Sequence, residues 1–233
     1  MIKVGICEDD IVCRKAVCKM LEQYFNEKET EYQLREYDSG DSFFEQHLST
    51  DILLLDIEMN GMTGIELKDL LCRTNEDIKI LFVTNHLEAM SDAFGKNVYG
   101  FLHKPIEQKE LEKYLDRVLE DIRENRGLVI KGADKEFVIK IRDIFYFESD
   151  DKYSCVVSSN GRYFCNRSLR QWEEELRDNF FFRCHKCYLV NFQNVQRMEE
   201  HICMCNGDKI PISRRRGKEL KDSYRKYIIK RAR

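Results

Sequence analysis

Four short apolar segments in the first half of the chain each run into a polar residue, and this feature constrains the fold most. The segments span residues 2–7, 52–55, 78–83 and 99–103. The run at 52–55 is apolar throughout, which is typical of a strand buried on both faces of a parallel sheet. The other three are strand-like segments that each contain one lysine or histidine. Because the carboxyl ends of such strands meet at one edge, the sequence predicts a single site there. The polar residues at the four ends are Glu8 and Asp9, Asp56, Thr84, and Lys104.

Segments with helical spacing alternate with these runs. A helix is expected over about residues 11–26, and Thr63 is expected to cap another, with Glu66 as its capping-box partner. Strand and helix alternate five times, which predicts an α/β domain with a parallel sheet and helices on both faces. The residues expected on the buried face of the first helix are Ile11, Val12, Ala16, Met20, Leu21 and Phe25.

The expected site suits phosphoryl chemistry. A carboxylate such as Asp56 can attack a phosphoryl group and become an acyl phosphate. Neighbouring acids would repel one another unless a hard cation neutralised them, and Mg²⁺ prefers a few carboxylates, waters and a phosphate oxygen. We expect Asp9 and Asp56 to be direct Mg²⁺ ligands and the backbone carbonyl of Glu58 to be a third. Glu8 is expected to act through water.

The remaining two polar residues complete this hypothesis. Lys104 would pair with a phosphoryl oxygen, and Thr84 would donate a hydrogen bond to another. Each residue alone has a plainer explanation, since Thr84 could end a strand, Lys104 could be a surface lysine and Asp9 could cap a helix. Their occurrence at the ends of four consecutive apolar runs favours the phosphoryl site.

This constellation resembles the receiver domain of bacterial two-component response regulators, over about residues 1–122. The resemblance implies a flavodoxin-like fold with a five-stranded parallel sheet, phosphorylated on Asp56 by a sensor histidine kinase. It also implies a switch in which Thr84 is drawn toward the phosphoryl group and Phe101 turns inward. One departure is Asn60, where the family usually has proline. The residues that carry the resemblance are Glu8-Asp9, Asp56, Thr84, Phe101 and Lys104-Pro105.

Charge divides the chain into unlike halves. Residues 1–125 carry 15 basic and 27 acidic side chains, a formal charge of −12, whereas residues 126–233 carry 24 and 15, a charge of +9. We therefore predict two domains, at residues 1–125 and 127–233. The basic one suggests a polyanionic partner, nucleic acid before membrane. Met1 leads straight into a predicted strand and no apolar run is long enough to cross a bilayer, so we expect a cytoplasmic protein with no membrane partner.

The basic half is expected to be mainly β. Short strand-like segments fill residues 128–212, Ser168 is expected to cap one inner helix, and a terminal helix is expected from about Arg215. Such a domain would have to contact DNA with loops and strand ends. The candidate residues fall in three places, which are Lys152, Tyr153 and Ser154, then Arg183, His185 and Lys186, and finally Arg214, Arg215, Arg216 and Lys218.

These segments resemble the LytTR DNA-binding domain over about residues 128–230. The resemblance implies a ten-stranded β fold whose loops enter successive major grooves of double-stranded DNA. It places Arg215 and Lys186 at base-reading positions, His185 in a structural or phosphate role, and Asn191 as a brace of a turn. The residues that carry it are Phe147-Glu148-Ser149, Phe182-Arg183-Cys184-His185-Lys186, Leu189-Val190-Asn191 and Ile212-Ser213-Arg214-Arg215.

The cysteines leave three interpretations open. Cys184 with Cys187, and Cys203 with Cys205, have spacings that zinc sites use, but the first pair should point to opposite faces of a strand. A regulatory disulfide is favoured over zinc, because the basic neighbours of Cys184 would lower its thiol pKa. Small buried apolar side chains are the preferred explanation.

The two halves together predict a phosphorylation-activated transcriptional regulator of a two-component system, of the LytR/AgrA type, and not an enzyme. We expect phosphorylation to promote a homodimer that binds paired DNA repeats with the avidity of linked modules. One alternative is a receiver-controlled signalling module whose basic domain binds RNA or a protein. A second, a hydrolase or phosphotransferase that uses the acidic cluster with Mg²⁺, is disfavoured because no further substrate pocket is predicted.

Overall fold

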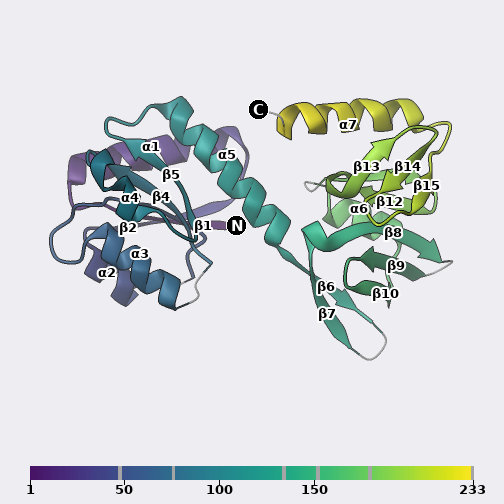
Figure 1. Ribbon diagram of the computed structural model, residues 1–233, viewed down its shortest axis with the longest axis horizontal. Helices are drawn as coiled ribbons and strands as arrows, with labels where there is room; N and C mark the ends of the chain where they lie inside the picture. The colour runs from purple at the N-terminus through teal and green to yellow at the C-terminus, as the bar shows by residue number, and fades with distance from the viewer. Residues whose placement is uncertain (47–48, 75–76, 133–134, 151–152, 178–179, 232–233) are drawn as a thin grey trace. The chain divides into compact units, whose positions relative to one another are not determined.

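The computed structural model describes residues 1–46, 49–74, 77–132, 135–150, 153–177 and 180–231 (Figure 1). Within them the chain forms two compact units, Met1–Ile122 and Arg123–Arg233. The predicted domain limits of 1–125 and 127–233 stay predictions, since compactness does not by itself define a domain.

The first unit is an α/β fold with a five-stranded parallel sheet in the order β2-β1-β3-β4-β5, which confirms the predicted fold class. Two separate cores cover the two faces of the sheet. One core packs α1 and α5 against the sheet, and the other packs α2, α3 and α4 against it. The strands are β1 (Ile2–Cys7), β2 (Tyr32–Tyr37), β3 (Ile52–Leu55), β4 (Lys79–Thr84) and β5 (Val98–His103). The helices are α1 (Ile11–Glu27), α2 (Gly40–Gln46), α3 (Gly64–Arg73), the 3₁₀ turn η1 (Leu87–Ala89), α4 (Met90–Ala93) and α5 (Gln108–Asn125).

The buried face of α1 differs from the predicted one. Ile11 and Val12 are 59% and 74% exposed, and Ala16 is also exposed. The first turn is capped by Asp10, whose Oδ1 accepts hydrogen bonds from the amides of residues 12 and 13, and packing on the sheet begins one turn later. The cap fixes where the helix begins, and packing on the sheet determines which face is buried. The residues that are buried are Val17, Cys18, Leu21, Tyr24 and Phe25.

The start of α3 lies directly against the end of β3. Thr63 and Glu66 form the predicted capping box, with the Thr63 hydroxyl accepting from the Glu66 amide at 3.3 Å and the Glu66 carboxylate accepting from the Thr63 amide at 2.9 Å. A Cβ atom on Gly64 would lie 2.0 Å from the carbonyl oxygen of Asp56. Only glycine therefore allows α3 to begin this close to the backbone of the site.

The second unit is mainly β, as predicted, and its described residues contain ten strands. They form a five-stranded antiparallel sheet in the order β10-β9-β8-β12-β11, a three-stranded sheet β13-β14-β15, and the hairpin β6-β7. The strands are β6 (Gly127–Lys131), β7 (Glu136–Lys140), β8 (Ile144–Asp150), β9 (Tyr153–Ser158), β10 (Gly161–Cys165), β11 (Phe181–His185), β12 (Tyr188–Asn191), β13 (Val195–Met198), β14 (His201–Met204) and β15 (Lys209–Pro211). The helical segments are η2 (Ile141–Asp143), α6 (Leu169–Glu175), η3 (Phe192–Asn194) and α7 (Gly217–Arg231).

Two helices complete the second unit. Trp172 of α6 is fully buried in one core, and Leu220 of α7 is fully buried in the other. The terminal helix begins at Gly217 rather than near Arg215, so the three consecutive arginines form the turn that precedes it. Among the described residues, no helix is both long enough and apolar enough to cross a membrane.

Candidate phosphoacceptor site and nucleic-acid surface

The strand ends of the first unit bring three acids and one lysine together. Lys104 Nζ lies 2.6 Å from Glu8 Oε2 and 2.6 Å from Asp56 Oδ2. Glu8 and Asp56 are 2% and 6% exposed, so this lysine sits between two nearly buried carboxylates. One carboxylate oxygen from each of Glu8, Asp9 and Asp56 lies within 4.8 Å of the others. The predicted cluster is therefore brought together by the fold.

The ionisation of the cluster follows from burial and from the central cation. Burial raises the pKa of Glu8, although the hydrogen bond and charge of Lys104 act in the opposite direction. For Lys104, burial acts to lower the pKa, but its hydrogen bonds to Asp56 and Glu8 outweigh this effect and raise it. The lysine therefore stays charged and offsets part of the repulsion among the acids.

The donor set fits a hard divalent cation. Three carboxylates against one ammonium leave a negative charge, and carboxylate oxygens are ligands that Mg²⁺ accepts. Asn60, which departs from the usual residue at its position, binds Asp9 with its side chain at 2.9 Å and its backbone amide at 3.3 Å. It thus orients one of the candidate ligands, a contact that the sequence did not suggest.

The two predicted switch residues lie on β4 and β5. Thr84 is fully buried, and its Oγ1 accepts a hydrogen bond of 3.0 Å from the amide of His86. The ring of Phe101 is 8% exposed and stacks on Phe82 with 5.3 Å between centroids. It also lies 5.1 Å from the ring of Phe94, which is largely exposed. The aromatic switch candidate therefore points inward.

His86, which was not among the predicted site residues, lies between two glutamates near the site. His86 Nε2 lies 3.0 Å from a carboxylate oxygen of Glu58, and Nδ1 lies 2.9 Å from Glu88. The hydrogen bond to Glu88 raises the pKa of His86. Since Glu58 is the residue whose carbonyl is a candidate Mg²⁺ ligand, this contact links the loops after β3 and β4.

The two described residues that were predicted to contact DNA from the first loop differ in exposure. Lys152 lies outside the described residues, and Tyr153 is 53% exposed. The prediction for Ser154 is wrong, because its side chain is fully buried and its hydroxyl accepts a 2.9 Å hydrogen bond from Trp172 Nε1. Strand β9 already begins at position 153, so the next side chain points into the core.

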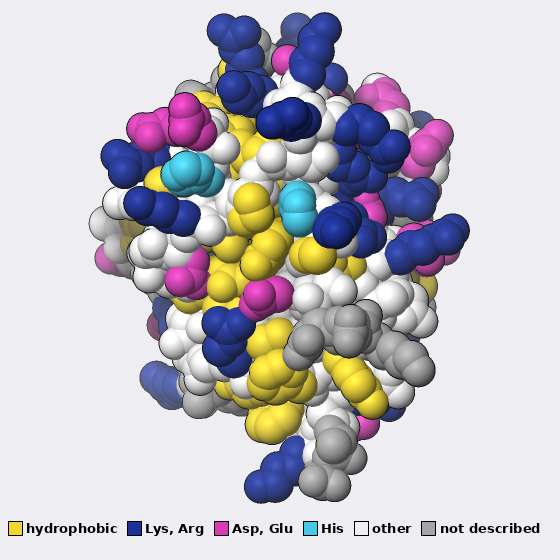
Figure 2. Space-filling view, turned by 90° about the vertical axis from the view of Figure 1, so that its right-hand side faces the viewer, with side chains coloured by type: hydrophobic (Ala, Val, Ile, Leu, Met, Phe, Trp, Pro, Cys, Tyr) yellow, Lys and Arg dark blue, Asp and Glu magenta, His cyan; other side chains and the backbone are white. Residues whose placement is uncertain are grey.

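The second and third loops lie side by side in the second unit. The amide of Ser213 donates to the carbonyl of Cys184 at 3.0 Å, which joins the strand before one loop to the segment that begins the other. Together the two loops line a surface hollow of about 430 Å³. Its lining is strongly basic and consists of Arg183, His185, Lys186, Ser213, Arg215 and Arg216. Figure 2 shows Lys and Arg side chains gathered over the upper part of one face of the molecule.

The basic side chains of these loops divide into two groups. Arg183 and Arg216 are half-buried, and each lies 3.4 Å from a carboxylate oxygen of Glu173 on α6, an acid that the sequence argument did not single out. The other group is exposed, and none of its members forms an ion pair with another described residue. Its members are Lys186, Arg214, Arg215 and Lys218.

Two residues of the central segment have internal roles. His185 Nδ1 accepts a 3.3 Å hydrogen bond from the amide of Cys187. Asn191 is fully buried and donates from Nδ2 to the carbonyls of Ile141 and Ile144 at 3.1 and 3.0 Å. The predicted bracing role of Asn191 is confirmed, since it ties the end of β12 to the start of β8.

The cysteines are all free thiols. Burial raises the pKa of Cys184 to about 12, and the side chain is fully buried. The expectation that basic neighbours lower this pKa is wrong, because desolvation outweighs their charge. Cys184 is part of one core of the second unit, which agrees with the preferred explanation of a small buried side chain.

Taken together, the fold and its sites define a two-domain signalling protein with a phosphoacceptor-type acidic pocket and a basic β domain. The response regulator receiver domain model matches residues 4–116, and the LytTr DNA-binding domain model matches residues 134–225. The chain belongs to the response regulators that combine these two domains, and it is a DNA-binding transcriptional response regulator of a two-component system.

Three relatives illustrate the match. The sensory transduction protein LytT of Bacillus subtilis is 25% identical over 95% of this chain and 98% of its own. An uncharacterized response regulatory protein of Yersinia pestis is 31% identical over 76% of this chain and 80% of its own. The transcriptional regulatory protein BtsR of Salmonella typhi is 30% identical over the same shares of the two chains. The similarity thus extends across both units.

Proposed function

We propose that Asp56 accepts a phosphoryl group from a partner sensor histidine kinase, and that the phosphorylated chain then binds paired repeats in double-stranded DNA as a homodimer. The observation that carries this proposal is Lys104 Nζ at 2.6 Å from both Asp56 and Glu8, with Asp9 beside them. The Lys104 ammonium is held beside the Asp56 carboxylate. It can therefore pair with a phosphoryl oxygen once this carboxylate has formed its bond to phosphorus.

The reaction is a nucleophilic displacement at phosphorus. A carboxylate oxygen of Asp56 forms the new P–O bond while the P–N bond of the donor phosphohistidine breaks, and its electron pair stays with the departing imidazole. Glu8, Asp9, Asp56 and the Glu58 carbonyl would hold Mg²⁺, which when bound neutralises phosphoryl oxygens. This neutralisation and the Lys104 charge together allow an anionic group to approach three acids.

The buried hydroxyl of Thr84 supports the switch part of the proposal. Its oxygen accepts from the His86 amide, so its hydrogen is left to donate to a phosphoryl oxygen. A shift of Thr84 toward the site would change the packing on its side of the sheet, where Phe101 contacts Phe82 and Phe94. A local charge event would then bias the arrangement of α4 and β5.

The basic loops support the DNA-binding part. Lys186 and Arg215 line the 430 Å³ hollow, are exposed, and suit phosphate and guanine contacts, with Arg214 and Lys218 beside them. A single small domain binds weakly, so pairing two of them on linked half-sites would supply the affinity gain.

The proposal is tested by selecting from a random pool of duplex DNA with the full-length chain. The selection is run with Mg²⁺ alone and with Mg²⁺ plus beryllofluoride, and Asp56→Asn serves as the unresponsive control. We expect a pair of repeats that is enriched more strongly with beryllofluoride for the wild-type chain only. Enrichment that ignores beryllofluoride would refute the coupling. No enrichment by a folded chain would favour the alternative in which the basic domain binds RNA or a protein.

A further inference from the structure

An acidic side chain lies between the two basic loops, and we propose that this residue, Glu173, positions the loops for DNA recognition. This inference rests on the proposed DNA-binding function and assigns separate roles within it. Glu173 and Arg183 hold the two loops in place, and the exposed Lys186 and Arg215 contact the DNA. Glu173 itself is a positioning residue that does not touch DNA.

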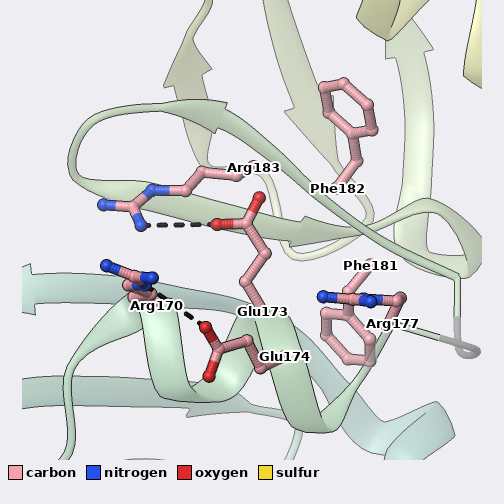
Figure 3. A pocket seen from close by; sticks show the side chains of 7 residues that line it. All are labelled: Arg170, Glu173, Glu174, Arg177, Phe181, Phe182 and Arg183. Atoms are coloured by element: carbon pink, nitrogen blue, oxygen red, sulfur yellow. Dashed lines mark hydrogen bonds and ion pairs between the residues drawn. The ribbon is translucent and has the colours of Figure 1, made fainter.

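The contacts of Glu173 join both loops to α6. Its Oε2 lies 3.4 Å from Arg183 Nη1, the contact drawn in Figure 3, and its Oε1 lies 3.4 Å from Arg216 Nη1. Arg216 Nη1 also donates to the carbonyl of Arg183 at 2.8 Å. Arg183 Nη2 donates to the carbonyl of Lys186 at 2.7 Å, which fixes the backbone of an expected DNA-contacting residue.

The core of the unit determines where Glu173 lies. Its neighbour Trp172 is fully buried, donates to Ser154 and is covered by the guanidinium of Arg167, 3.9 Å from the ring centroid. The helix is also held by the capping box of Ser168. Because α6 is fixed on the core, Glu173 can act as a rigid anchor that ties both arginines, and through them both loops, to this helix.

The negative charge of Glu173 is unfavourable for DNA binding in general. A carboxylate in a surface that meets phosphates reduces the general attraction for nucleic acid, since binding strength rises with the positive charge presented. Glu173 also ties up donors of Arg183 and Arg216 that would otherwise reach phosphates. Glu173 therefore weakens the general attraction of the surface for nucleic acid. Its presence is explained if the fixed geometry of the two loops increases affinity for one DNA sequence by more than this loss.

Glu174 provides a matched control on the same helix. Its carboxylate lies 3.2 Å from Arg170, one turn earlier, a contact drawn in Figure 3. Among the described residues, Glu174 forms no ion pair with either of the two loops. Glu173→Gln and Glu174→Gln remove the same charge from α6. Only the first weakens the anchoring of the loops, so a comparison of the two separates geometry from charge.

The test measures binding of the full-length, beryllofluoride-activated chain to its selected duplex and to a scrambled duplex by fluorescence anisotropy. We expect Glu173→Gln to bind the selected duplex about tenfold more weakly, the scale of two part-exposed ion pairs, with no loss on the scrambled duplex. We expect Glu174→Gln to lose affinity for neither. Simple destabilisation of the fold would weaken binding to both duplexes. It would therefore not change the ratio of the affinities for the selected and the scrambled duplex.

Amide exchange gives a second measurement that needs no DNA. The Ser213 amide, which donates to Cys184 across the two loops, should exchange faster in Glu173→Gln than in Glu174→Gln. The positioning role alone would be overturned if the Ser213 amide exchanged equally fast in the two variants. It would also be overturned if the two variants bound DNA equally well while the wild-type chain preferred the selected duplex. A wild-type chain that did not distinguish the duplexes would instead overturn the proposed DNA-binding function.

Discussion

Replacing Lys104 by methionine tests whether this lysine holds the acidic cluster together. Its side chain is 12% exposed and lies 2.6 Å from two carboxylates whose side chains are 3% and 8% exposed. Removing one partner of a buried ion pair costs about 3–5 kcal/mol. The site opens at a sheet edge, so we expect the lower end, about 3 kcal/mol of unfolding free energy at pH 7.5 in EDTA.

The loss should depend on pH in a definite direction. The folded pKa of Glu8 is raised above its unfolded value, so the folded chain holds this proton more tightly and its contribution to stability is lost as pH rises through the folded pKa. Lys104 lowers that pKa, and removing the ammonium raises it further. The deficit of Lys104→Met should therefore be largest at pH 7.5 and smaller at pH 5.

Mg²⁺ should also reduce the loss of unfolding free energy in Lys104→Met, because the pocket of this variant carries one more uncompensated negative charge that the cation can neutralise. A ligand at ten times its dissociation constant adds about 1.4 kcal/mol to the stability of the state that binds it. Lys79→Met is the matched control. Lys79 is 5% exposed and pairs with Asp77 and Asp121, at 2.5 and 3.2 Å, at the opposite edge of the sheet. Its deficit should not respond to Mg²⁺.

Urea unfolding followed by far-UV circular dichroism measures these changes. Trp172 is the single tryptophan and lies in the second unit, so its fluorescence transition serves as an internal reference that should stay unchanged. The reasoning would be refuted if Lys104→Met cost no stability, or if its deficit ignored Mg²⁺ in the way expected for Lys79→Met.

Three further predictions follow from the sites. Asp56→Asn should abolish labelling by acetyl phosphate yet change the unfolding free energy by less than about 1 kcal/mol, because it removes both an attraction to the lysine and repulsion among acids; a large loss of stability would make Asp56 a structural residue. Ser154→Ala should cost about 1–3 kcal/mol in urea unfolding, since Trp172 Nε1 loses its partner, while sequence preference in DNA binding stays the same. In iodoacetamide labelling followed by mass spectrometry, exposed Cys205 should react early and Cys184 only on unfolding, since burial raises the pKa of Cys184 to about 12; early labelling of Cys184 would contradict its burial.

The acidic site could be predicted because its geometry depends on features that a sequence records. Strand ends in a parallel sheet meet at one edge, so the positions of Glu8, Asp56 and Lys104 after apolar runs implied their proximity. The Thr63–Glu66 capping box likewise depends only on residues three apart. Such local and periodic rules need no knowledge of which side chains from distant loops meet.

The errors arose where strand phase or tertiary contacts decide. Ser154 was counted among the DNA-contacting loop residues, but it is the second residue of β9, and its side chain is buried in the core. Arg216 was treated as one of three equivalent arginines, whereas an acid 43 positions away binds it. Burial, rather than sequence neighbours, sets the pKa of Cys184. None of these facts is encoded in the adjacent residues.

The close approach at Gly64 has a consequence for how tolerance to mutation would be interpreted. Any side chain there would overlap the Asp56 carbonyl, 2.0 Å from where its first carbon would lie. In a saturation-mutagenesis screen for signalling, position 64 should thus be as intolerant as the phosphoacceptor, although it carries no reactive group. Mutational sensitivity alone would therefore mark Gly64 as a functional residue, although its role is to leave room for the backbone carbonyl of Asp56.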